Sequence, residues 1–123
     1  MSKGSVLLVG LDPAVVDYSR WPDMSEESLT AMLNAEVQSL LDNGFDAEIC
    51  YLADRARAAA EVAALLDSKT FDCIIIGAGV RLDPDEFLLF EALINVVHAH
   101  APKAKIGFNG GPKSTAEAAL RLL

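Results

Sequence analysis

Basic residues are few in this chain. Ten lysines and arginines stand against eighteen aspartates and glutamates, so the formal net charge at pH 7 is −8. A protein that binds nucleic acid or an anionic membrane surface normally presents clustered positive charge, because phosphate groups repel an acidic protein. Here the basic residues are scattered along the chain. We therefore expect no nucleic acid and no membrane among its partners.

Long apolar runs are missing as well, and cysteine is scarce. No apolar stretch reaches the roughly 20 residues of a membrane-spanning helix, and the one that follows the first five residues is too short for the core of a signal peptide. The two cysteines, Cys50 and Cys73, lack the spacing of a redox or metal motif. Each falls in or beside a predicted strand, with the first strand between them, so we expect inert free thiols. The expected location is cytoplasmic.

Linkers and low-complexity segments are absent too. No proline-rich or serine-rich stretch separates two domains, and 123 residues suit one domain, since single domains most often have about 100–150 residues. Aromatic residues make up 7% of the chain, whereas hydrophobic residues together make up 52% and are mainly Ala, Leu, Val and Ile. This composition is typical of a compact α/β protein, and we expect a single domain over residues 1–123.

Short apolar runs, each closing on a glycine, are the strongest positive signal. These runs lead to Gly10, Gly77 and Gly110. Uninterrupted runs of this kind are typical of parallel strands that helices cover on both faces. The predicted strands are Val6–Val9, Ala47–Leu52, Asp72–Ile76 and Lys105–Phe108.

Stretches with helical periodicity alternate with the strands. Helices are predicted over Ser25–Asp42, Arg55–Asp67 and Pro84–His100, and from Ser114 to Leu123. Their predicted caps are Asp23 with Glu26, Asp54, Asp83 with Glu86, and Ser114 with Glu117. Parallel strands joined by helices require right-handed crossovers. The predicted fold is a three-layer α/β sandwich with strand order 2-1-3-4, the first and fourth helices on one face and the second and third on the other.

In element order and length, the chain resembles flavodoxin-like and response-regulator receiver domains with one strand–helix unit missing. The resemblance implies the fold, but no particular activity, because this fold hosts many functions. A receiver would need a phosphate-accepting aspartate at the end of the third strand, where Gly77 stands. A flavodoxin would need Ser, Thr and Gly after the first strand, where Asp12 and Asp17 would repel a flavin phosphate. Gly77 and Gly79 begin a dinucleotide motif whose third glycine is replaced by Leu82, so we expect no cofactor.

The carboxyl ends of the first, third and fourth strands form the candidate ligand site. The boundary between the first and third strands is the topological switch point, where sheets of this kind bind ligands. The guanidinium of Arg81 suits a carboxylate or phosphate, and Asn109, Gly110 and Gly111 would add an amide and backbone donors. The expected ligand is a small anionic or polar molecule. The predicted site residues are Gly10, Asp12, Arg20, Trp21, Gly77, Arg81, Asn109 and Gly110.

The connection from Gly10 to Met24 has about fifteen residues, well above the usual 2–6, and it holds the only tryptophan. Trp21 would fold over the ligand. Two structural alternatives stay open: Trp21 could pack against the sheet edge, and Asp12 could form an ion pair with Arg81 that ties two loops together. Whether the protein is an enzyme is also open. If it is one, Asp12 is the candidate general base.

The alternative function is a non-catalytic oligomeric or regulatory module. In the segment 87–97 of the third predicted helix, only Glu91 and Asn95 are polar. One sheet face cannot cover so wide an apolar surface. With Phe87, Phe90, Ile94 and Val97 on the sheet, the residues left for the second helix or another chain to cover are Leu89, Leu93 and Val96. We therefore predict a homodimer through these last three residues.

Overall fold

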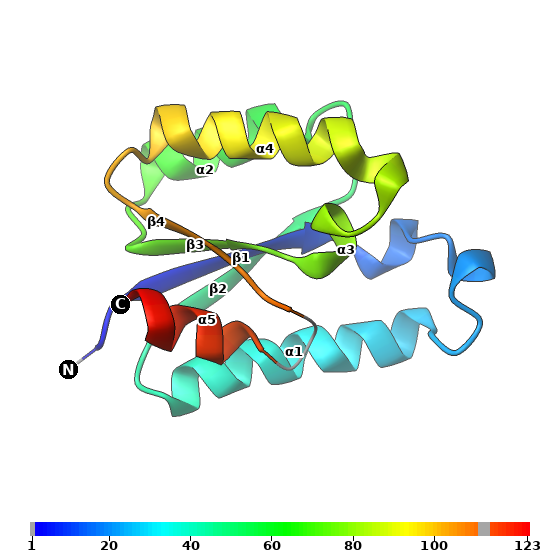
Figure 1. Ribbon diagram of the computed structural model, residues 1–123, viewed down its shortest axis with the longest axis horizontal. Coiled ribbons are helices and arrows are strands. Elements are labelled where there is room, and N and C mark those ends of the chain that lie inside the picture. The colour runs from blue at the N-terminus through cyan, green and yellow to red at the C-terminus, as the bar shows by residue number, and fades with distance from the viewer. Residues whose placement is uncertain (1, 111–113) are drawn as a thin grey trace.

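A computed structural model of the protein describes residues 2–110 and 114–123 and contains one parallel sheet of four strands (Figure 1). The strands are β1 (Ser5–Leu11), β2 (Asp46–Leu52), β3 (Cys73–Ile76) and β4 (Lys105–Phe108). The helices are α1 (Glu26–Asp42), α2 (Ala58–Ser68), α3 (Ala78–Arg81), α4 (Phe87–His100) and α5 (Thr115–Leu122). Short 3-10 helices are η1 (Pro13–Val15), η2 (Tyr18–Arg20) and η3 (Pro84–Glu86).

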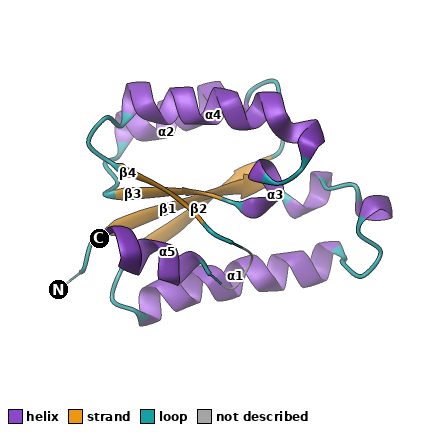
Figure 2. Ribbon diagram, in the orientation of Figure 1, coloured by secondary structure: helices purple, strands orange, loops and turns teal. Residues whose placement is uncertain are grey.

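The sheet lies between two layers of helices, and its strand order is β2-β1-β3-β4. α1 and α5 cover one face, and α2 and α4 cover the other (Figure 2). The prediction of a flavodoxin-like three-layer sandwich is confirmed. Strand β1 shows why uninterrupted apolar residues predict a central strand. Leu7 and Val9 belong to the core under α2 and α4, whereas Val6 and Leu8 belong to the core under α1 and α5. A strand buried on both faces has no polar positions.

The two cysteines lie on strands that do not touch each other. Cys50 is on β2 and Cys73 on β3, with β1 between them, and both thiols are free, as predicted. Burial raises the pKa of the Cys73 thiol to about 11 and also raises the pKa of the Cys50 thiol. Both side chains therefore stay protonated and unreactive at neutral pH.

Helix α1 begins with a different cap from the one predicted. Ser25 and Ser28 form a reciprocal capping box: the Ser28 amide donates to the Ser25 hydroxyl at 3.1 Å, and the Ser25 amide donates to the Ser28 hydroxyl at 2.8 Å. The predicted pair of Asp23 and Glu26 was wrong, because a serine nearer to the first helical turn takes the capping position. At the other end Gly44, with φ of 91°, stops the helix as predicted.

Two more helix starts differ because the expected caps form other hydrogen bonds. The Asp54 carboxylate accepts from the Ala56 amide at 2.9 Å and caps a separate turn, so α2 begins after this turn and not at Arg55. The Ser114 hydroxyl accepts from the Gly110 amide at 2.7 Å and makes no capping bond to α5. Each side chain accepts from a backbone amide outside the helix, which is the usual competition between turns and helix caps.

The residues predicted for a dimer surface on α4 are covered mainly by the chain itself. Leu89 and Leu93 are buried in the core, and Val96 packs against that core while partly exposed. The cover comes from α2, which lies beside α4 on the same face of the sheet and contributes Val62 and Leu66 to the same cluster (Figure 1). The alanine-rich surface of α2 lets the two helices approach closely. These α4 residues therefore need no second chain to exclude water.

The exposed apolar residues of α4 lie in its first turn instead. Leu88 is 73% exposed and Phe87 is 61% exposed, although Phe87 was predicted to pack on the sheet. The helix is preceded by the 3-10 turn η3, so an α-helical spacing counted from Pro84 assigns Phe87 to the wrong face. In the described part of the chain, no helix combines the length and the apolarity needed to cross a bilayer.

Candidate functional site

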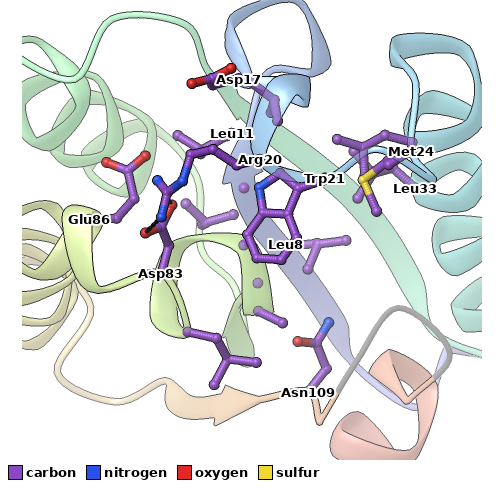
Figure 3. Close-up of a pocket in the computed structure, with 18 of the residues that line it drawn as sticks. Leu8, Leu11, Asp17, Arg20, Trp21, Met24, Leu33, Asp83, Glu86 and Asn109 are labelled. Carbon is purple, nitrogen blue, oxygen red and sulfur yellow. Dashed lines mark hydrogen bonds and ion pairs between the residues drawn. The ribbon is translucent and has the colours of Figure 1, made fainter.

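A pocket of about 450 Å³ lies at the carboxyl ends of β1 and β3 (Figure 3). Strand β1 and the start of α3 form its floor, α1 forms one wall, and the segment between β3 and α4 forms the other. The connection between β1 and α1 covers it. Most of the lining is apolar, and six of the aliphatic or thioether side chains in it are Leu8, Leu11, Val16, Met24, Leu29 and Leu33.

Two glycines shape the floor in opposite ways. The Gly77 amide donates to the Val9 carbonyl at 2.9 Å, and a Cβ at Gly77 would lie 3.2 Å from the same oxygen. A side chain there would push the end of β3 away from β1. At Gly10, in contrast, a Cβ would meet open space, on the same face of β1 as Leu8 because side chains alternate along a strand. Gly10 therefore leaves volume to the pocket.

The connection between β1 and α1 has internal structure of its own. The Asp12 carboxylate accepts from the Ala14 amide at 2.9 Å and caps η1, and the Asp17 carboxylate accepts from the Ser19 amide at 3.1 Å and caps η2. The Ser19 hydroxyl also donates to Asp17 at 2.6 Å, which lowers the pKa of that carboxyl. Asp12 caps its turn outside the pocket lining, so the structure gives no support to a role for it as general base there.

Trp21 lies over the pocket, and its ring crosses the opening between Arg20 and Leu8 (Figure 3). The residue is 48% exposed, so one side of it faces solvent while the other lines the pocket. Tyr18, which was expected beside it, instead donates its hydroxyl to the Pro13 carbonyl at 2.6 Å and stabilises the connection. A half-exposed indole in such a position reports on anything that enters the pocket.

Arg20 fastens this cover to the opposite wall. Its guanidinium donates to both carboxylate oxygens of Asp83, at 3.1 and 3.2 Å, and lies 2.9 Å from a carboxylate oxygen of Asp85. Hydrogen bonding to Asp83 raises the pKa of Arg20. We call this group the Arg20 latch. Because Arg20 already forms ion pairs with two carboxylates, its positive charge is not free to bind an anionic ligand.

A second arginine is neutralised in the same wall. The Arg55 guanidinium donates to Glu86 at 2.5, 2.8 and 3.0 Å, and this hydrogen bonding raises the pKa of Arg55. Arg55 is half-exposed, whereas Glu86 is only 6% exposed. Glu86 was predicted to cap the helix that follows. It binds Arg55 instead. Leaving a buried carboxylate without a positively charged partner costs more free energy than leaving a helix end without a second cap.

A buried polar cluster closes the end of the pocket next to β4. Glu36 of α1 is 6% exposed and Asn109 is 4% exposed, and both line the pocket. The Asn109 amide nitrogen donates to Glu36 at 3.2 Å and to the Thr115 hydroxyl at 2.9 Å, and Thr115 also donates to Glu36. Desolvation raises the pKa of Glu36, against the opposing effect of these two hydrogen bonds. The pocket thus contains a carboxyl group that burial makes easier to protonate.

Arg81 does not line the pocket and instead contacts the end of β4. Its guanidinium donates to the backbone carbonyl of Asn109 and lies over the Phe108 ring, with 5.7 Å between the guanidinium carbon and the ring centroid. Asp12 forms no ion pair with Arg81, because the Asp12 carboxylate accepts from the Ala14 amide and the Arg81 guanidinium donates to the Asn109 carbonyl. Both the expected ligand contact and the alternative ion pair of Arg81 are therefore replaced by a contact that holds Asn109 in place.

Some of the predicted site residues line the pocket and others do not. Those that line it are Gly10, Arg20, Trp21, Gly77 and Asn109. Those that do not are Asp12, Arg81 and Gly110, and Gly111 falls outside the described residues. The charged lining residues are Asp17, Glu36, Asp83, Asp85 and Glu86 against Arg20 and Arg55. This excess of carboxylates disfavours an anionic ligand.

Sequence reasoning missed Glu36, Arg55 and Glu86 as pocket residues. Arg55 carried one signal, because it stands in the first turn of a predicted helix, where the helix dipole disfavours a cation unless a carboxylate or another anion lies nearby. Glu36 carried another. It falls on the apolar stripe of α1, at helical spacing from Leu33 and Leu40, where a charged residue is out of place unless it is paired or functional. The contact between Arg55 and Glu86 joins residues that are distant in the chain, so nothing in the local sequence identifies Glu86 as the partner.

The chain matches no protein-family model and no curated protein. The fold narrows the function little, because doubly wound α/β sheets host many unrelated activities.

The Arg20 latch yields a first prediction. Replacing Arg20 by methionine should leave the melting temperature nearly unchanged, since ion pairs at the surface add little stability, but it should release the cover of the pocket. We expect faster amide hydrogen exchange across residues 18–24, measured by mass spectrometry, and a red-shifted Trp21 emission. Arg57→Met is the matched control. Unchanged exchange in Arg20→Met would show that the cover is held by its internal contacts alone.

Proposed function

We propose that this protein binds a small organic molecule with an apolar body in the pocket beneath Trp21. The observation that carries the proposal is the pocket itself: about 450 Å³, lined mainly by apolar side chains, with a few polar groups collected at one end. Small-molecule sites commonly have this composition and often lie at the switch point of a parallel sheet. The excess of lining carboxylates favours a neutral or cationic ligand over the anionic one expected from the sequence.

The proposal predicts that filling the pocket prevents binding without harming the fold. Gly10→Leu adds a side chain where the structure has open space, in a strand where glycine is unfavourable, so the melting temperature should stay the same or rise. Small neutral aromatic probes such as 2-phenylethanol should change Trp21 fluorescence and shift amide resonances around the pocket in the wild type. We expect Gly10→Leu to weaken this binding at least tenfold.

Ala60→Leu provides the control, because it places the same leucine side chain on an exposed position of α2. If the probes bind Gly10→Leu as well as the wild type, or if none of a panel of small aromatic and aliphatic molecules perturbs the pocket resonances, the proposed function is wrong.

Self-association is the second candidate function, and the exposed apolar residues Phe87, Leu88 and Leu82 favour it. These residues lie in α3 and the first turn of α4 or directly beside them, so a second copy could cover them in a two-fold arrangement. We expect Leu88→Glu to convert a dimer to a folded monomer in sedimentation velocity experiments at micromolar concentration. A wild-type protein that is strictly monomeric under these conditions contradicts this candidate.

A further inference from the structure

We propose that the polar end of the pocket recognises a primary ammonium group, so that the ligand is an amine with an apolar body. The inference rests on the proposed function, because it names the chemistry of a molecule bound in the same pocket. Two hydrogen-bond acceptors there, one on Asn109 and one on Glu36, have no donor among the residues that the structure describes. Their side chains come from different elements and meet inside the apolar lining.

The first acceptor is the side-chain carbonyl oxygen of Asn109. The Asn109 amide nitrogen donates to Glu36 and to Thr115, and an ionised carboxylate can only accept, so this hydrogen bonding fixes the orientation of the amide. The carbonyl oxygen is then left buried, and none of the described residues forms a hydrogen bond with it. Figure 3 shows the Asn109 side chain rising from the end of β4 toward Trp21. Buried polar atoms are nearly always paired, so this one calls for a partner from outside the chain.

The second acceptor belongs to Glu36. Both hydrogen bonds to this carboxylate, from Asn109 and from Thr115, go to Oε1. Within residues 2–110 and 114–123, no donor reaches Oε2. Glu36 Oε2 is not among the fully buried unpaired atoms, and since Glu36 lines the pocket, a ligand can approach this oxygen from there. A positively charged donor stabilises such a largely desolvated carboxylate more than a neutral donor does. The two unpaired oxygens together therefore favour a ligand group that carries several donors and a positive charge.

A primary ammonium group meets these requirements and fits its surroundings. It supplies three donors and no acceptor, which matches a corner that offers only acceptors. Arg20 and Arg55 do not oppose it, because Asp83 and Glu86 neutralise them. Arg81 does not line the pocket. Next to Glu36 on the same helix, Leu29 and Leu33 continue the lining as apolar surface, which would receive the hydrocarbon part of the amine.

A matched ligand series separates this inference from the proposed function. The probes are 2-phenylethylamine, 2-phenylethanol and phenylacetate, which share the ring and differ in the charge of the head group. By isothermal titration and amide chemical shifts at pH 7, we expect the amine to bind the wild-type protein at least tenfold more tightly than the alcohol, and phenylacetate to bind more weakly still. Equal affinity for amine and alcohol overturns the ammonium inference but leaves the pocket proposal intact. If neither binds, the pocket proposal fails for this ligand class as well.

Two further measurements make the assignment specific. Glu36→Gln keeps the size of the side chain and removes its charge, so it should lose the preference for the amine while keeping the affinity for the alcohol. A preference that survives in Glu36→Gln contradicts the assignment to this corner. Titration with Mg²⁺ and Ca²⁺ tests the other cationic occupant: binding of either ion that Glu36→Gln abolishes, together with an amine that binds no better than the alcohol, would replace the ammonium by a metal ion.

Discussion

Replacing Arg55 by alanine is expected to lower the free energy of unfolding by about 1–3 kcal/mol, more than any other surface arginine of the protein. The change leaves the Glu86 carboxylate, which is only 6% exposed, without the guanidinium that donates to it at 2.5, 2.8 and 3.0 Å. Removing one partner of a buried pair costs the desolvation of the other. We place the loss below the largest values seen for such pairs because Arg55 itself is half-exposed and water screens part of the interaction.

Two variants control this experiment. Arg57→Ala removes the same charge from a neighbouring exposed position and should change the free energy of unfolding by less than about 0.5 kcal/mol. Adding Glu86→Gln to Arg55→Ala removes the unpaired charge and should recover part of the loss. Urea denaturation curves of the wild type, Arg55→Ala, Glu86→Gln and the double variant give the coupling free energy. If Arg55→Ala is as stable as Arg57→Ala, the pair contributes nothing and Glu86 must be solvated.

The parts of the fold that the sequence predicted are those that depend on local pattern. Strand β1 is apolar without interruption because both of its faces are covered, and this pattern identifies a central parallel strand before any contact is known. The strand order follows from the same reasoning. The faces of α4 could not be predicted in this way. Which α4 residues are buried depends on how closely α2 packs beside α4 and on the 3-10 turn that precedes α4. The spacing of apolar residues within α4 reveals neither of these.

The sequence predicted where the pocket lies in the fold, but it did not predict which charged side chains pair with each other there. The switch point and the long connection bearing Trp21 located the pocket, since both follow from topology and loop length. The ion-pair partners of the charged residues could not be predicted from topology or loop length. Arg20 binds Asp83, and Arg55 binds Glu86, across more than thirty residues of sequence in each case, so charge pairing in this site is a product of the tertiary fold. Arg81, the arginine that suggested an anion site, donates in the folded protein to the Asn109 carbonyl and does not line the pocket.

Replacing Glu36 by glutamine should change how the stability of the protein depends on pH. Desolvation raises the pKa of Glu36 in the folded state above its ordinary value. The folded state therefore binds the proton more tightly than the unfolded state does. The contribution of this group to stability is complete below the ordinary pKa of glutamate, and it is lost as the pH rises through the higher, folded pKa. Each unit of difference between the two pKa values corresponds to about 1.4 kcal/mol.

The measurement compares urea denaturation of the wild type and Glu36→Gln between pH 4 and pH 8. Subtracting the two curves removes the titration of all other groups, and the remaining slope belongs to Glu36. We expect the wild type to lose stability relative to the variant as the pH rises across this interval, and the variant to be at least as stable at pH 8. Glutamine can still accept from Asn109 and Thr115, so the two hydrogen bonds that hold the cluster are preserved. A difference that stays constant with pH would mean that water reaches Glu36 freely and that the carboxyl group is not the desolvated acceptor on which amine recognition depends.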